Sequence, residues 1–136
     1  MTAKSSFNVI GWDDSVYSEM ESGAKLSQAK VKKEFRGDLN GSSTAEVLMC
    51  LSNADDYMAG AGYVASEVVE GELNGRSGSF IVQHGGLNGP DGEQTFGTII
   101  PGSGTGELEG ISGSFIVSKN ADGSHEVVIE YEQQNG

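Results

Sequence analysis

The most informative stretch of the sequence is Gly71–Val82, which reads GELNGRSGSFIV. A close copy, GELEGISGSFIV, occupies Gly106–Val117, and a weaker copy, GDLNGSSTAEVL, occupies Gly37–Leu48. The copies begin 34 and 35 residues apart, so the chain contains an internal repeat. In each copy a β-type run enters an Asn-Gly or Glu-Gly pair and a second β-type run leaves it. This pattern predicts a tight β-hairpin, because glycine adopts a positive φ at no steric cost.

The length and net charge of the chain limit the number of domains and the kinds of partner that we expect. A chain of 136 residues predicts one domain over residues 1–136. The net charge of −12 comes from 20 acidic and 8 basic residues. It disfavours nucleic acid and anionic membranes as partners, because phosphate recognition requires clustered Lys and Arg. Met1–Asp14 lacks the apolar core of a signal peptide, and no apolar run approaches the roughly 20 residues that span a bilayer. We therefore expect a cytoplasmic protein.

Alternation of apolar and polar side chains predicts eight strands. The first is Phe7–Trp12, followed by polar residues 13–26, which predict a long loop or a frayed helical turn. The second ends at an Asn40-Gly41 turn, and Lys33 is the one charged residue on its apolar face. In the fourth, Glu67 falls on the same side as apolar residues. The six strands from the third onward are Thr44–Leu51, Gly62–Glu70, Gly78–His84, Glu93–Pro101, Ser112–Ser118 and His125–Glu132, with a glycine-rich loop at Gly85–Gly92.

Eight short strands joined mostly by tight turns, with no helix of three turns, predict an all-β fold. The favoured form is a closed eight-stranded antiparallel up-and-down barrel, because closure removes the exposed edges of the sheet. Eight strands give an interior that side chains just fill or that holds one small ligand. A two-sheet β-sandwich is the alternative.

Several segments resemble a family of small bacterial proteins of unknown function. The segments are Ser77–His84, Ile100–Leu108, His125–Glu132, the early Trp12, and the Leu48-Met49 pair that follows Glu46. The resemblance covers nearly the whole chain and implies a closed barrel similar to that of allene oxide cyclase. It does not imply the cyclase reaction, since the family that the chain resembles has no assigned reaction.

One glutamate stands at an unusual place in the repeat. The repeat aligns Glu46 with Phe80 and Phe115, so a carboxylate occupies a position that the other copies give to a phenylalanine. If that face lines the barrel, Glu46 is buried. Burial favours the uncharged form of a carboxyl group unless a partner holds its charge.

A buried glutamate beside other ionisable groups is typical of acid–base sites. His84 falls on the same strand face as Phe80, and a tyrosine nearby, Tyr63 or Tyr131, completes such a group with Glu46. The alternative is a glutamate near the barrel rim, paired with Lys or Arg. These six residues (Glu46, Tyr63, Phe80, His84, Phe115, Tyr131) are the candidate ligand-binding residues.

Two other sequence features do not match known phosphate-binding or zinc-binding motifs. Gly102–Gly106 lacks the Lys and the helix of a phosphate-binding loop. The soft metal ligands Cys50, His84 and His125 do not have the spacing of a zinc site. We expect no metal and no cofactor.

These patterns leave three classes of function. The first is a binding module that holds a small apolar or amphipathic ligand in the barrel. The second is an isomerase or cyclase that uses the same cavity. The third is a solid barrel that serves as a subunit of an assembly. The Ser-Phe-Ile-Val strands are apolar on both faces, which predicts a homodimer.

Overall fold

The computed structural model describes residues 1–134, which form one antiparallel sheet and a single 3₁₀ turn, η1 (Tyr57–Ala59). The strands are β1 (Thr2–Glu19), β2 (Lys25–Gly37), β3 (Leu39–Leu51), β4 (Ala61–Leu73), β5 (Arg76–Gly89), β6 (Gly92–Ile99), β7 (Thr105–Gly106), β8 (Ile111–Lys119) and β9 (His125–Gln133). No helix among these residues is long and apolar enough to cross a membrane.

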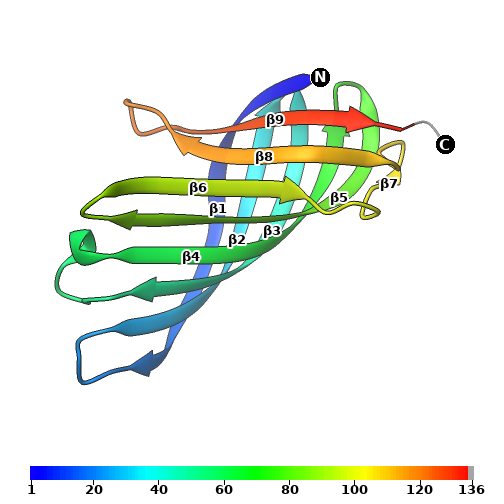
Figure 1. Cartoon of the computed structure of the whole chain (residues 1–136). Helices are drawn as coiled ribbons and strands as arrows, with labels where there is room; N and C mark the ends of the chain where they lie inside the picture. Colours follow the sequence, from blue (N-terminus) through cyan, green and yellow to red (C-terminus); the bar gives the residue numbers. More distant parts are fainter. Residues whose placement is uncertain (135–136) are drawn as a thin grey trace.

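The strand pairings close on themselves. The order β1-β2-β3-β4-β5-β6-β8-β9 returns to β1, and the two-residue β7 pairs with β5. The described strands thus form one sheet with a ring of eight strands rather than two packed sheets (Figure 1). The predicted all-β fold is confirmed.

The ring is closed at one end and open at the other. β1 pairs with β9 only through Thr2–Phe7, and β6 pairs with β8 only through Thr98 and Ile99. Phe7 pairs with His125, the first residue of β9, so β1 continues past the end of β9, and Figure 1 shows it running toward the lower left. The neighbouring strands β2–β5 remain paired over their full lengths, so they form a curved wall around the opening.

Large apolar side chains fill the closed end. Phe115 lies at the centre, with ring centroids 6.3 Å from those of Phe35 and Phe80. Burying each such side chain contributes roughly 2 kcal/mol. The members of this cluster are Ala3, Phe7, Phe35, Leu39, Val69, Leu73, Phe80, Val82, Ile99, Leu108, Ile111, Phe115, Val127, Ile129 and Tyr131.

Smaller side chains line the wall toward the open end. Ala29, Val31, Ala45, Val47 and Ala65 form a second cluster, against which Met49 and Tyr63 pack. These five residues are themselves buried, and the interior cavity opens beyond them, where Met49 and Tyr63 line it. The protein therefore combines a solid end with a hollow end.

The predicted turns are partly wrong. Asn74-Gly75 forms the expected two-residue turn, with positive φ at both residues (48° and 86°). The weaker copy turns earlier, at Gly37-Asp38, and its Asn40-Gly41 pair lies inside β3. The amide of Asn40 instead bonds the backbone N–H and C=O of Gly37, which stabilises the earlier turn. The third copy is not a hairpin, because β7 pairs with β5 and not with β8.

Two predicted loops are strands. Residues 13–26 are strand as far as Glu19, because this part of β1 pairs with β2 and both of its faces meet solvent at the open end, where polar side chains are stable. The Gly85–Gly92 segment is strand through Gly89. Two aromatic rings cover its bare glycines, that of Phe96 over Gly85 and that of Tyr63 over Gly86.

Gly97 is required where β6 meets β8. A Cβ at this position would overlap the backbone carbonyl oxygen of Phe115. We predict that Gly97→Ala lowers the free energy of unfolding by about 2 kcal/mol, since the strands must move apart. Gly89→Ala is the control, because Gly89 has open space around it, and its effect should stay within about 0.5 kcal/mol. Equal urea midpoints for the two variants would contradict this account of ring closure.

Candidate functional site

A fully buried carboxylate, that of Glu67, lies on the inner face of the ring, between its two ends. Its Oε1 accepts hydrogen bonds from Lys33 Nζ at 3.0 Å and from His84 Nε2 at 2.7 Å. Its Oε2 accepts a hydrogen bond from Ser43 Oγ at 2.6 Å. Every buried side-chain nitrogen or oxygen atom among residues 1–134 has a hydrogen-bond partner. The four side chains, Lys33, Ser43, Glu67 and His84, are called the Glu67 cluster below.

Strand register brings the Glu67 cluster together. Lys33 of β2 pairs with Ser43 of β3, and Ser43 pairs in turn with Val69 of β4, two residues from Glu67. Side chains two residues apart in a strand share a face, so all four cluster residues point inward. Lys33 also lies over the ring of Phe7, 4.9 Å from its centroid, which favours the ammonium charge there.

The cluster keeps Glu67 ionised. Burial raises the pKa of this carboxyl group, but hydrogen bonds from His84 and Ser43 and the charge of Lys33 outweigh burial and lower the pKa to about 2. At neutral pH Glu67 is therefore an anion that only accepts hydrogen bonds. It follows that His84 donates its Nε2–H to Glu67.

A tyrosine extends the cluster toward the open end. The hydroxyl of Tyr63 lies 3.1 Å from Nδ1 of His84. In the neutral form of His84 that carries its proton on Nε2, Nδ1 is the acceptor and the Tyr63 hydroxyl donates to it. The pKa of Tyr63 is raised by burial and by the negative charge of Glu67, so the phenol stays protonated. Gly86 makes room for the Tyr63 ring, because a Cβ there would stand 2.8 Å from it.

Tyr63 lines a cavity of about 500 Å³ at the open end of the ring. A β-bulge at Ile10 shifts the register of β1 by one residue, so Trp12, Asp14 and Val16 face inward opposite Val31, Ala29 and Ser27. Together with Met49, Leu51 and Tyr57 these side chains enclose the space next to Tyr63. Tyr63 therefore contacts both this cavity and, through His84, the Glu67 cluster.

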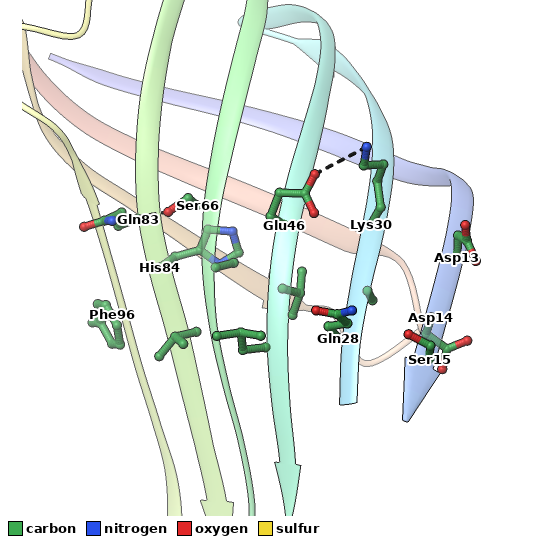
Figure 2. A pocket seen from close by; sticks show the side chains of 15 residues that line it. Asp13, Asp14, Ser15, Gln28, Lys30, Glu46, Ser66, Gln83, His84 and Phe96 are labelled. Atoms are coloured by element: carbon green, nitrogen blue, oxygen red, sulfur yellow. Dashed lines mark hydrogen bonds and ion pairs between the residues drawn. The ribbon is translucent and has the colours of Figure 1, made fainter. Parts of the chain in front are cut away.

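A groove of about 710 Å³ on the outer face has a different character. It runs across the strands between two rows of outward side chains, and its floor is the backbone row of Ala29, Val47 and Ala65. Figure 2 shows Lys30 and Glu46 in one of these rows, joined by an ion pair of 3.5 Å. Such a solvent-exposed pair has little effect on stability.

The predicted burial of Glu46 is wrong. Its side chain is 68% exposed and pairs with Lys30; the alternative interpretation expected such a pair, but near the rim and not on the outer face in the middle of β3. The cause is the early turn at Gly37-Asp38, which breaks the alignment of the weaker copy with the other two. The inward residue next to Val69 is Ser43 in β3 and Phe80 in β5, so Ser43, not Glu46, corresponds to Phe80.

Of the six predicted residues, Tyr63 and His84 are joined by a hydrogen bond, and the ring of Phe115 packs against His84 with centroids 6.3 Å apart. Phe80 and Phe115 lie in the solid end. Tyr131 also lies there, and its hydroxyl accepts a hydrogen bond from Asn74 instead of contacting His84. The predicted constellation of a buried glutamate with a histidine and a tyrosine exists, but with Glu67 as the glutamate.

Sequence reasoning missed the roles of Lys33 and Glu67, although a signal was present. Both residues interrupt strands at positions whose neighbours two residues away are buried, such as Val31 and Phe35 around Lys33. One lysine and one glutamate on inward positions of nearby strands indicate a buried ion pair. Cys50 is a free, exposed cysteine. Within residues 1–134 no group of three or more His, Cys, Asp or Glu is placed to hold a metal ion.

Comparison with known proteins identifies the family. The profile of a protein family of unknown function, DUF3224, matches residues 3–131. The chain belongs to the DUF3224 family. A DUF3224 protein of unknown function from Shewanella oneidensis MR-1 has a similar crystal structure, with a TM-score of 0.88 and 29% sequence identity, over 100% of this chain and 98% of that chain. No curated protein matches the chain. The predicted resemblance to a family of unknown function is confirmed, and the likeness to allene oxide cyclase stays a prediction.

The Glu67 cluster makes stability depend on pH. Because the folded pKa of Glu67 is about 2 and the ordinary value is 4.5, its charge stabilises the fold above pH 4.5 and this contribution is lost between pH 4.5 and 2. We predict that Glu67→Gln costs about 3 kcal/mol at pH 7, where it leaves Lys33 without a counter-charge. The difference from the unmodified protein should shrink as the pH falls toward 2.

Urea unfolding at several pH values measures this effect. Glu46→Gln is a matched control, because Glu46 also pairs with a lysine but on the surface, and its cost should stay below about 1 kcal/mol throughout. A cost of Glu67→Gln that is the same at pH 7 and pH 3 would show that the carboxylate is not held ionised by the cluster.

Proposed function

We propose that the protein binds a small, partly apolar molecule in the cavity at the open end of the ring, with Tyr63 as its main polar contact. The observation that carries this proposal is the position of the Tyr63 hydroxyl. The hydroxyl is hydrogen-bonded to His84, which is bonded in turn to Glu67, and the Tyr63 residue lines a cavity of about 500 Å³. Ligand sites typically combine an apolar wall with a few polar groups held in place.

The energetics of the Glu67 cluster support a site rather than a purely structural role. A buried ion pair stabilises a fold weakly, because the cost of removing both charges from water offsets their attraction. Apolar side chains of similar size at Lys33 and Glu67 would extend the solid end of the ring at no greater cost. The charges of Lys33 and Glu67 have a functional role if they orient His84, which in turn orients Tyr63.

An isomerase or cyclase that uses the same cavity is the second candidate. The chain of hydrogen bonds from Tyr63 through His84 to Glu67 favours it, since a phenol held by an imidazole and a carboxylate can donate and recover a proton. Lys33 weakens this candidate, because it already neutralises Glu67 and leaves no free counter-charge for a protonated His84. The candidate predicts a change in the proton NMR spectrum of a bound compound with the unmodified protein but not with His84→Gln.

Three expectations from the sequence stay predictions. They are the single domain over residues 1–136, the cytoplasmic location and the homodimer. A homodimer would cover outward apolar side chains of β3–β6, which include Leu48, Val64, Leu87 and Phe96. We also propose that the ring of eight strands is a barrel of the allene oxide cyclase kind, based on the resemblance in sequence.

Two adjacent residues test the location of the ligand. Ser27 faces the cavity, and Gln28, the next residue of β2, faces the outer groove. We predict that Ser27→Phe weakens binding of the neutral dye phenylnaphthylamine at least tenfold by filling the cavity, while Gln28→Phe leaves the affinity unchanged. Dye fluorescence measures both affinities. Loss of binding in Gln28→Phe alone would place the ligand in the outer groove, and no binding to the unmodified protein would contradict the proposal.

A further inference from the structure

The direction of the hydrogen bonds determines what the Tyr63 oxygen offers to a ligand. Glu67 accepts from Nε2–H of His84, and in the neutral imidazole with its proton on Nε2 the Nδ1 accepts from Tyr63, so the single proton of the Tyr63 hydroxyl is then used. Within residues 1–134 this oxygen makes no other hydrogen bond. What remains is lone-pair capacity on a side chain that lines the cavity. A complementary ligand group is therefore a donor, an O–H or an N–H.

Charge around the cavity disfavours an anionic ligand. The charged side chains that line it are Asp14, Glu93 and Lys25, with one more acid than base, and the whole chain carries a charge of −12. Carboxylates and phosphates are repelled by such a wall. The apolar part of the lining penalises any ion that enters without a partner, so a neutral molecule fits best.

The apolar lining favours a flat ligand. The aromatic side chains at the cavity are Trp12, Tyr57 and Tyr63, and Met49 and Leu51 lie among them. Aromatic rings stack on flat partners, and the thioether of methionine adapts to ring edges.

We infer that the ligand is an uncharged, flat, largely apolar molecule with one O–H or N–H group, which donates a hydrogen bond to the Tyr63 oxygen. This inference rests on the proposed binding function and adds the chemical class of the ligand. No group of the cavity needs to change its protonation state for this contact, because Glu67, His84 and Tyr63 keep the pattern described above.

Three related dyes separate the elements of this inference. Phenylnaphthylamine is neutral and has one N–H donor. Its N-methyl derivative lacks the donor, and anilinonaphthalenesulfonate retains the N–H but adds a negative charge. Trp12 is the only tryptophan of the chain and lines the cavity, so its fluorescence reports occupancy of this site. We expect phenylnaphthylamine to bind about tenfold more tightly than either of the other two, as one hydrogen bond lost or one repelled charge implies.

Tyr63→Phe removes the acceptor and keeps the ring. In this variant the preference for phenylnaphthylamine over its N-methyl derivative should disappear, while the N-methyl derivative binds as before. Tyr57→Phe is the matched control, because it deletes a phenol at the same cavity that is not bonded to His84, and the preference should remain. Thermal unfolding of both variants checks that each is folded.

The outcomes distinguish this inference from the proposed function. If none of the dyes changes Trp12 fluorescence, the proposed function and the inference both fail. If the dyes bind but the N-methyl derivative or the sulfonate binds as tightly as phenylnaphthylamine, the cavity is a binding site and the inferred ligand class is wrong. A preference that survives in Tyr63→Phe would also overturn the inference, since another group would then supply the acceptor.

Discussion

The site depends on one buried anion, the carboxylate of Glu67. Its two oxygens receive three hydrogen bonds, from Lys33, Ser43 and His84, and these lower its pKa to about 2 in spite of burial. The ionised carboxylate then determines the tautomer of His84 and the direction in which the Tyr63 hydroxyl points. Through these hydrogen bonds the charge of Glu67 determines whether the Tyr63 hydroxyl, at the open end of the ring, can donate or accept a hydrogen bond.

The division of the ring into a solid and a hollow end follows from side-chain size and strand pairing. Phe35, Phe80 and Phe115 meet where β1, β9, β8 and β6 complete the ring. Toward the other end the wall carries alanine and valine, and β1 continues past the end of β9 after Phe7. The core and the cavity therefore lie at opposite ends of the same strands, so the cavity does not interrupt the packing of the core.

The sequence predicted the class of fold better than the site. The alternation of apolar and polar side chains and the internal repeat were sufficient to predict an all-β fold. A strand with one buried face shows apolar residues at every second position. These patterns failed at Glu46, because the turn of the weaker copy moved to Gly37-Asp38 and shifted its register. They could not predict that Trp12 faces the cavity, since the bulge at Ile10 exchanges the two faces of β1. Glu67 and Lys33 were visible as charged residues on apolar faces, but only the three-dimensional pairing joins them.

The most direct test of this account is a crystal structure of the protein with phenylnaphthylamine bound. The account predicts the dye between Trp12 and Tyr63, with its nitrogen about 3 Å from the Tyr63 oxygen and the Glu67 cluster unchanged. A dye bound only in the outer groove beside Glu46, or one whose nitrogen points away from Tyr63, would contradict it.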